Sequence, residues 1–153
     1  MTNFAGVIAD THGLLRPEAI AALQGAELII HAGDFGKPEI LAELQRIAPV
    51  YGVRGNVDRG DWAARLPLTE VVTYGERLIY LLHDRQQLDL NPAAAGFGAV
   101  ISGHSHQPQI EWRHGVLYFN PGSAGPRRFS LPVTVGRLTI EEGELKAALV
   151  ELC

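Results

Sequence analysis

Glu27-Leu28-Ile29-Ile30-His31-Ala32-Gly33-Asp34 is the stretch of sequence that decides the fold. Its apolar run, 28–30, predicts a short strand buried on both faces. Gly33 ends the run, and Asp34 stands at the carboxyl end, where α/β sheets carry their functional groups. Alone, a Gly-Asp pair is more typical of a turn or helix cap than of a metal ligand. Because other strand ends also carry ligand-type residues, we interpret Asp34 as a carboxylate that joins two metal ions.

Length, composition and charge predict one domain spanning residues 1–153, located in the cytoplasm. The chain is 46% hydrophobic and 20% charged, and its net charge of −4 argues against a general nucleic-acid-binding surface. No apolar run is long enough to cross a membrane, and residues 1–4 lack the basic region of a signal peptide. Cys153 is the sole cysteine, expected to be a free thiol without a role, which excludes a disulfide. The sequence leaves open whether the chain forms a homo-oligomer.

The first half of the chain alternates between predicted strands and predicted helices. Pro17 and Pro38 each stand at a favourable first helical position, with apolar residues following at helical spacing. The expected elements are strand 4–9, helix 17–24, strand 28–31, helix 38–47 and strand 49–53. This alternation predicts parallel pairing with right-handed crossovers.

The second half changes to the two-residue period of β-strands. Three hairpins are expected, with arms 68–73 and 77–82, 109–112 and 116–119, and 132–140 and 144–152. A short helix is expected over 91–96 and a further strand over 98–102. We therefore expect an antiparallel second half, and two sheets packed face to face with helices outside.

Two strand ends besides that of Asp34 in the first half carry metal-type residues. Asp10-Thr11-His12 places a carboxylate and an imidazole two residues apart, which suits a borderline divalent ion, but an Asp10 turn with His12 exposed fits equally well. Asn56, after Gly55, has a neutral amide oxygen that can bind a metal ion, and the side chain can also lie beside a bound phosphate. Gly-Asn is equally typical of an ordinary turn. His31 is more typical of a hydrogen-bonded core residue than of a ligand, and we assign it no role.

The most specific motif is Gly103-His104-Ser105-His106, at the end of the predicted strand 98–102. Alternate histidines on an extended loop can ligate two neighbouring ions from one segment. Two solvated histidines are the other interpretation, and the ligand-type residues at other strand ends count against it. His83 stands at the end of the first hairpin and adds one more imidazole, whereas His114 lies in a hairpin turn and is expected to be exposed.

With Asp10-x-His12, Gly33-Asp34, Gly55-Asn56, His83 and Gly103-His104-x-His106 in this order, the chain resembles the calcineurin-like metallophosphoesterases. Within them it is most similar to the small prokaryotic phosphodiesterases often called YfcE-like, and Asn120-Pro121-Gly122-Ser123 is typical of that branch. The resemblance implies an α/β fold, a four-layer α/β/β/α sandwich of two mixed β-sheets flanked by helices. It also implies one ion held by Asp10, His12 and His106, and another held by Asn56, His83 and His104, with Asp34 bridging.

The chemistry of such a site can be argued from its ligands. Two aspartates against two divalent ions leave the site net positive by about two charges if the histidines are neutral, which favours a phosphate dianion or a diester anion. The expected substrate is a small phosphodiester or nucleotide-like molecule. Two ions roughly 3.5–4 Å apart lower the pKa of a bridging water and hold the attacking and leaving oxygens. The nucleophile would be a metal-bridging hydroxide, with Asp34, Asn56 and His104 as catalytic residues. Nitrogen and oxygen ligands suit manganese, our first choice, or iron, nickel, cobalt or zinc.

The chain departs from the family pattern at two places. Val57 stands where many larger relatives have a histidine that protonates the leaving oxygen, which predicts a preference for diesters and weak action on alkyl monoesters. Asp58 could replace that acid through a water, but a supporting or surface role is the better interpretation. His83-Asp84-Arg85 replaces the usual His-Gly-His of the branch. Asn56 and Arg127 are the expected substrate contacts; Arg85 and Arg128 could also reach a phosphate, and solvated arginines are equally consistent.

Two other functions compete with a phosphodiesterase. A non-catalytic scaffold is possible because a eukaryotic retromer subunit uses a similar fold to bind partners, but a scaffold has no need of the full set of ligand residues. A phosphomonoesterase or nucleotide hydrolase is disfavoured by Val57.

Overall fold

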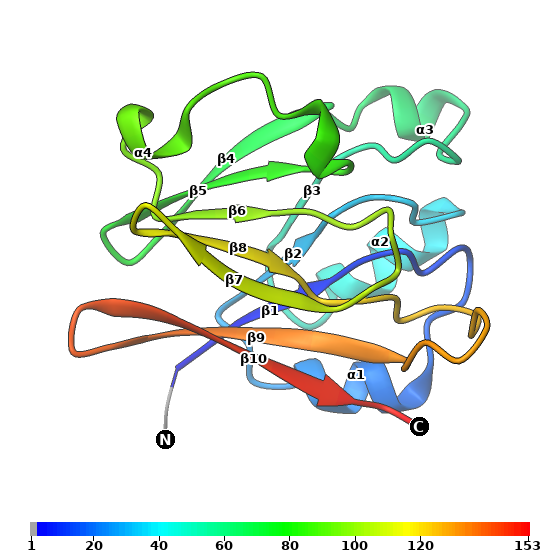
Figure 1. Cartoon of the computed structure of the whole chain (residues 1–153). Coiled ribbons are helices and arrows are strands. Elements are labelled where there is room, and N and C mark those ends of the chain that lie inside the picture. The colour runs from blue at the N-terminus through cyan, green and yellow to red at the C-terminus, as the bar shows by residue number, and fades with distance from the viewer. Residues whose placement is uncertain (1–2) are drawn as a thin grey trace.

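Two five-stranded β-sheets stack face to face in the computed structural model, which describes residues 3–153 (Figure 1). The first sheet has the strand order β10-β9-β1-β2-β3. Its strands are β1 (Ala5–Ile8), β2 (Leu28–His31), β3 (Val50–Gly52), β9 (Thr134–Glu141) and β10 (Glu144–Glu151). The strands β1, β2 and β3 are parallel, as predicted, while β9 and β10 form an antiparallel hairpin that pairs with β1.

The second sheet has the order β4-β5-β6-β8-β7. Its strands are β4 (Thr69–Tyr74), β5 (Arg77–Leu82), β6 (Ala99–Ile101), β7 (Gln109–Arg113) and β8 (Val116–Asn120). The hairpins β4–β5 and β7–β8 are antiparallel, whereas β5, β6 and β8 run parallel. Both sheets are therefore mixed, which confirms the predicted sandwich of two mixed sheets.

The expectation that the second half is antiparallel is wrong for β6, which pairs in parallel with β5 and β8, and the placement of the C-terminal hairpin was not predicted. The segment between β5 and β6 is a crossover that carries the 3-10 helix η1 (Arg85–Gln87) and α4 (Pro92–Ala95), so β6 pairs in parallel with β5. The C-terminal hairpin joins the first sheet, because β9 pairs with β1. In β9, Leu138 packs between the sheets and Val135 packs with the helix layer, so the strand is buried on both faces as an inner strand requires.

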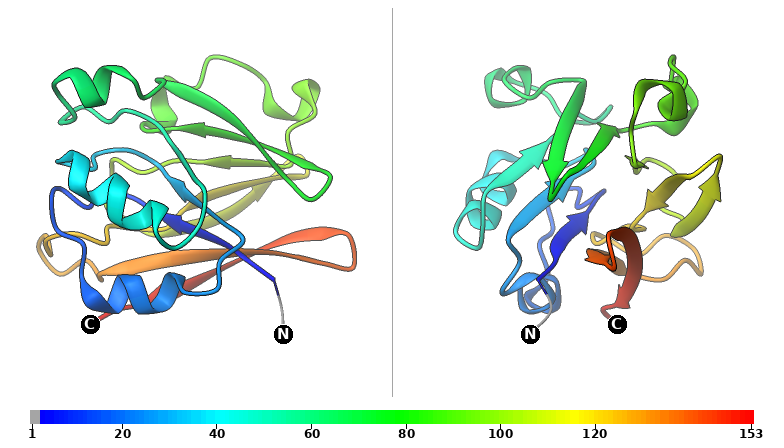
Figure 2. Two further views of the ribbon diagram at one scale, coloured as in Figure 1. Left: turned by 180° about the vertical axis from the view of Figure 1, so that it is seen from behind. Right: turned by 90° about the vertical axis from the view of Figure 1, so that its left-hand side faces the viewer.

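Helices form the outer layers of the sandwich. On the first sheet lie α1 (Pro17–Leu23), α2 (Pro38–Gln45) and the short α3 (Asp61–Ala64), which the sequence did not predict (Figure 2). Leu23 of α1 and Leu44 of α2 pack against Ile29 of β2. On the outer face of the second sheet, the crossover covers β5 and β6, where Leu88 and Phe97 pack on Tyr80 and Val100.

The main core lies between the two sheets. Val7 and Ile30 of the first sheet pack with Ile79, Leu81 and Ile101 of the second, and all of these side chains are fully buried. This apolar contact fixes the two sheets against each other, so the loops that leave their strand ends are held side by side. Among residues 3–153, no helix combines the length and the apolar character needed to cross a bilayer.

Candidate metal centre

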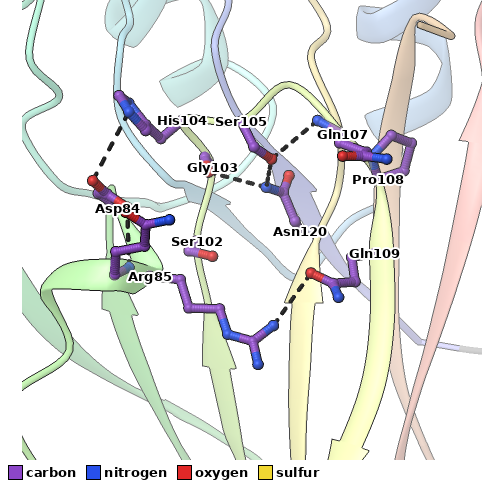
Figure 3. Close-up of a pocket in the computed structure, with 11 residues that line it drawn as sticks. Asp84, Arg85, Ser102, Gly103, His104, Ser105, Gln107, Pro108, Gln109 and Asn120 are labelled. Carbon is purple, nitrogen blue, oxygen red and sulfur yellow. Dashed lines mark hydrogen bonds and ion pairs between the residues drawn. The ribbon is translucent and has the colours of Figure 1, made fainter.

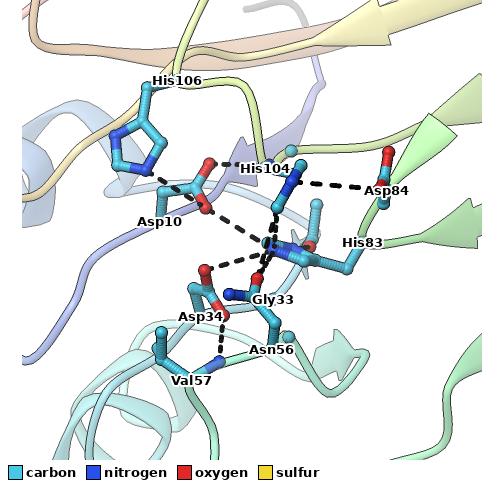
Figure 4. A network of polar contacts seen from close by, with 12 residues as sticks. Asp10, Gly33, Asp34, Asn56, Val57, His83, Asp84, His104 and His106 are labelled. Atoms are coloured by element: carbon cyan, nitrogen blue, oxygen red, sulfur yellow. Dashed lines mark hydrogen bonds and ion pairs between the residues drawn. The ribbon is translucent and has the colours of Figure 1, made fainter. Parts of the chain in front are cut away.

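The predicted ligands leave the ends of strands from both sheets and lie together, and Figure 4 shows all of them except His12. From the first sheet come the loops after β1, β2 and β3, and from the second sheet come the loops after β5 and β6. The residues that these loops bring together are Asp10, His12, Asp34, Asn56, His83, His104 and His106. The whole predicted ligand set is therefore assembled at one edge of the sandwich.

One candidate metal site consists of Asp10, His12 and His106. The two imidazoles face each other, with their Nε2 atoms 3.2 Å apart. Asp10 Oδ1 lies 3.8 Å from His106 Nε2 and 3.9 Å from His12 Nε2. These separations are near those of atoms that share an ion at about 2.1 Å each. The three residues are the set expected to hold the first ion.

The second candidate site gathers around His83. Its Nε2 atom lies 2.9 Å from Asn56 Oδ1 and 3.2 Å from Asp34 Oδ2, and Asp10 completes this group of acidic and imidazole ligands. Asn56 Oδ1 also lies 3.2 Å from His104 Nδ1. Asp34 Oδ2 is 3.6 Å from His12 Nε2 as well, so it faces members of both sites, as a bridging carboxylate must.

The Asp10 carboxylate has the surroundings expected of a cation ligand. Its Oδ1 atom is buried and has no hydrogen-bond partner among residues 3–153. Burial raises the pKa of Asp10 to about 7, because its charged form is cut off from water; Asp34 raises the pKa further, while His83 opposes the shift. A buried oxygen without a donor is costly unless a cation binds it. Carboxylate, amide and imidazole groups also match the preferences of borderline divalent metals.

Two of the imidazoles, those of His12 and His106, are prepared to bind as neutral ligands. Burial lowers the pKa of His12, and it lowers the pKa of His106 to about 4, with the charge of Arg128 adding to both shifts. His83 differs: burial lowers its pKa, but its hydrogen bonds with Asp34 and the Ala32 carbonyl outweigh burial and raise it. His83 Nδ1 donates to Ala32 O at 2.7 Å, which leaves Nε2 to face Asp34 and Asn56.

Asp34 stays ionised in the absence of a metal ion. Burial acts to raise its pKa, but hydrogen bonds from His83 and from the Val57 backbone outweigh burial and lower it. The Val57 N–H donates to Asp34 Oδ1 at 2.9 Å. The two aspartates are therefore unequal: Asp10 must release a proton to bind a cation near neutral pH, whereas Asp34 need not.

Most of these ligands have left-handed backbone conformations. The φ angles are 55° at Asp10, 47° at His12, 61° at Asp34, 72° at His104 and 63° at His106. Such angles are uncommon for residues other than glycine and cost on the order of 1 kcal/mol or more each. They persist only where the surrounding structure enforces them, and they cluster at functional sites.

Asp58 holds the loops of the predicted ligands in place, whereas the sequence left a supporting and a surface role open. It is 5% exposed. Its Oδ2 atom accepts hydrogen bonds from Asp34 N at 3.0 Å and Gly55 N at 2.9 Å, and its Oδ1 atom accepts one from Gly36 N at 2.9 Å. Asp58 thus supports the metal site through the backbone and is not a surface residue. Its position three residues after Gly55, typical of a turn aspartate, was the available signal.

His31 supports the same loops from beneath, which agrees with the expectation that it is no direct ligand. It is fully buried, its Nδ1 atom accepts a hydrogen bond from Gly33 N at 3.0 Å, and its Nε2 atom lies 3.1 Å from Thr11 Oγ1. Burial lowers the pKa of His31 to about 3, so the ring is neutral. It therefore links the loop that carries Asp10 and His12 to the loop that carries Asp34.

The arginines near the site differ in their availability. Arg127, expected to contact substrate, donates to the carbonyl oxygens of Leu131 and Cys153, so its substrate role stays a prediction. Arg85 pairs with Glu111 at 2.9 Å and lies over the Tyr118 ring. Arg128 is the arginine whose charge acts on the site, since it lowers the pKa of His12 and His106.

Fold and site together define a class of protein: an α/β/β/α sandwich with two candidate metal sites of aspartate and histidine at its strand ends. The model of the calcineurin-like phosphoesterase superfamily domain matches residues 4–143. A relative named "Probable metallophosphoesterase", from Methanothermobacter thermautotrophicus, is 40% identical over 156 residues, covering 95% of this chain and 90% of the relative. The chain therefore belongs to the calcineurin-like phosphoesterase superfamily.

Solved structures agree on the fold. An archaeal phosphodiesterase superposes with a TM-score of 0.79 and 23% identity, covering 96% of this chain and 99% of that one. The phosphoesterase YfcE from E. coli gives a TM-score of 0.69 and 22% identity, covering 98% and 100% of the chains. Zinc-bound Vps29 from Entamoeba histolytica superposes with a TM-score of 0.70 and 22% identity, covering 98% of this chain and 99% of that one.

Proposed function

We propose that this chain is a metal-dependent phosphodiesterase that uses two divalent ions, manganese in the first instance, to hydrolyse a small phosphodiester. The observation that carries the proposal is the arrangement around Asp34, whose Oδ2 atom lies 3.2 Å from His83 Nε2 and 3.6 Å from His12 Nε2. One carboxylate oxygen between two groups of imidazoles is the geometry that a dinuclear site needs.

The proposed ligands follow the two groups. Asp34 bridges; Asp10, His12 and His106 hold one ion, and Asn56, His83 and His104 hold the other. When bound by these residues, two divalent ions would supply water activation and neutralisation of the phosphate charge. Within the chain, Asn56 and His104 are proposed to contact the substrate, because the His104 side chain is 46% exposed and the Asn56 amide lies beside it. Arg128 adds positive charge that attracts the anion.

Val57 supports diesters as the substrate class. Its backbone N–H holds Asp34, but its side chain is apolar and 39% exposed, so it offers no proton to a leaving oxygen. Val57→His should raise the rate of alkyl phosphomonoester hydrolysis by about tenfold or more, since general-acid catalysis contributes up to 10²–10⁴-fold. The monoester-to-diester rate ratio is the measurement and Val57→Leu the control. A wild-type ratio above one would contradict the diester preference.

The direct test is hydrolysis of bis(4-nitrophenyl) phosphate by purified protein with added manganese. Turnover should fall to background with EDTA and in Asp34→Asn, and should return when manganese is restored to the wild type. Asp89→Asn is the matched control, because Asp89 is exposed and lies outside the candidate sites. Absence of turnover with every divalent metal, together with stoichiometric binding of a partner protein, would favour a scaffold.

A further inference from the structure

A polar cleft lies next to the candidate metal centre, on the side of the second sheet (Figure 3). Its volume is about 420 Å³, within the range of small-molecule sites. It is bounded by the turn that follows β5, which carries Asp84 and Gln86, and by the segment from Ser102 to Gln109. His104 lines the cleft and also belongs to the ligand set around His83, so a molecule held at the metal centre can extend directly into the cleft.

Several hydrogen-bonding groups of the cleft have no partner among residues 3–153. The Ser102 side chain is 4% exposed, yet its hydroxyl makes no hydrogen bond within that range and faces the space beside Arg85 and Asn120 (Figure 3). The side-chain amides of Gln86 and Gln107 are likewise unpaired within the described chain, and Gln109 uses only its Oε1 atom, which accepts from Arg85. By contrast, Asn120 is satisfied, since it donates to Gly103 O and Ser105 Oγ.

The lining disfavours three kinds of occupant. An apolar group would cover these polar atoms without replacing their hydrogen bonds to water, because Pro108 is the sole apolar side chain in the lining. A second anionic group would meet Asp84, whose Oδ2 atom lies 3.8 Å from His104 Nε2, while Arg85 is already neutralised by Glu111 at 2.9 Å. A nucleobase would find one aromatic ring in the lining, the His104 imidazole, and that ring belongs to the ligand set around His83.

We propose that this cleft binds an uncharged, polyhydroxylated alcohol esterified to the phosphate, such as a glyceryl group. The inference rests on the proposed phosphodiesterase and names the class of its substrate. Hydroxyls can both donate and accept, so they satisfy the Ser102 hydroxyl and the amides of Gln86 and Gln109 together. With the phosphate at the metal centre, His104 marks the point where the ester arm enters the cleft.

The first arm of the test is binding, and it does not depend on turnover. Glycerol is titrated into the ¹⁵N-labelled protein, with 1-propanol as the matched probe that lacks the two additional hydroxyls. Glycerol should shift the amide signals of Ser102, Gln86 and Gln109, and 1-propanol should not. Ser102→Ala should weaken the glycerol response without loss of folding, because the hydroxyl that it removes makes no hydrogen bond within residues 3–153.

The second arm compares glyceryl 4-nitrophenyl phosphate with propyl 4-nitrophenyl phosphate, which share one leaving group. The manganese-loaded wild type should have a KM about three- to tenfold lower for the glyceryl ester, as expected for one or two hydrogen bonds. Ser102→Ala combined with Gln86→Ala should bring the ratio close to one. Gln45→Ala, on the exposed face of α2, should leave the ratio unchanged.

The outcomes separate the two proposals. Hydrolysis of both esters with equal KM, or a ratio that the cleft variants leave unchanged, overturns the cleft proposal and leaves the phosphodiesterase intact. If neither ester is hydrolysed, the phosphodiesterase proposal is overturned. The glycerol titration then tests the cleft proposal by itself: shifts at Ser102 support it, and their absence overturns it.

Discussion

Asp58 carries the strongest residue-scale prediction. Asp58→Ala leaves three backbone N–H groups without an acceptor, the buried ones of Asp34 and Gly55 and the less buried one of Gly36, so the free energy of unfolding should fall by roughly 2–5 kcal/mol. Affinity for divalent metal should fall as well, because Asp34 loses its support. Urea unfolding and metal titration are the measurements.

The conservative variant makes the argument more specific. Asp58→Asn can keep the bonds from Asp34 and Gly55 through one oxygen but places an amide opposite Gly36 N, so its stability should lie between wild type and Asp58→Ala. If Asp58→Ala were as stable as the exposed control Asp89→Ala, the role assigned to Asp58 would be wrong.

Asp10 gives a pH-dependent prediction for the metal-free protein. Its pKa is raised from 3.8 to about 7, so the folded state binds the Asp10 proton more tightly than the unfolded state does. This contribution to stability is complete below pH 4 and is lost as the pH rises to about 7. His12 and His106, with lowered pKa values, change stability in the opposite direction, so the wild-type slope alone does not isolate Asp10.

Asp10→Asn removes this titration. In EDTA, the variant should gain stability relative to wild type between pH 4 and pH 7, by an amount on the order of 4 kcal/mol, with little further gain above pH 7. Unfolding by urea at several pH values measures the difference. A difference independent of pH would show that Asp10 does not titrate as stated.

At the scale of elements, the loop after β3 approaches the loop after β2 as closely as glycine allows. A Cβ atom on Gly55 would lie 2.1 Å from Asp34 Oδ1 and 2.3 Å from Asp34 N. Gly55→Ala should therefore displace Asp34 and lower the diesterase rate by at least tenfold, since misplacement by about 1 Å can cost 10²-fold.

Gly98→Ala is the matched control for Gly55→Ala. Its added Cβ would meet the flexible end of Leu145 at 3.2 Å, remote from the metal centre, so activity should change little. Equal rates in the two alanine variants would contradict the importance of this loop contact.

The elements of the first half could be predicted because each signal is local. Proline at the first helical position and apolar residues at helical spacing gave α1 and α2, and short apolar runs gave β1, β2 and β3. The place of β9 could not be predicted, because an isolated hairpin pattern does not say which sheet it joins. The short helices α3 and η1 are too brief to show a period.

The candidate site, too, could be predicted only in part. That Asp34, Asn56 and His104 lie close together could be predicted, because they are ligand-type residues shortly after predicted strands, where α/β sheets collect their functional groups. The choice between Arg127 and Arg128 depends on side-chain direction in a loop, which the sequence does not determine. The cleft beside Ser102 depends on residues from separate loops that become neighbours only on folding.

For the whole molecule, metal binding should stabilise the folded state against unfolding. A metal ion at 100 times its dissociation constant stabilises the folded state by about 2.7 kcal/mol, which for a chain of this size raises Tm by roughly 5–10 °C. EDTA should reverse the increase, and His106→Ala should reduce it because one imidazole of the first group is lost. Differential scanning calorimetry measures both effects. A Tm that is insensitive to manganese, zinc and EDTA would contradict a dinuclear site.

The proposed ligands come from loops of both sheets, so their spacing depends on residues that contact no ion. Lateral slippage of one sheet over the other would change the spacing between Asp34, after β2, and His83, after β5. Leu81, buried in the contact between the sheets, opposes that slippage. Trimming this apolar side chain, two residues before His83, would thus weaken cation retention while leaving every coordinating atom chemically unaltered.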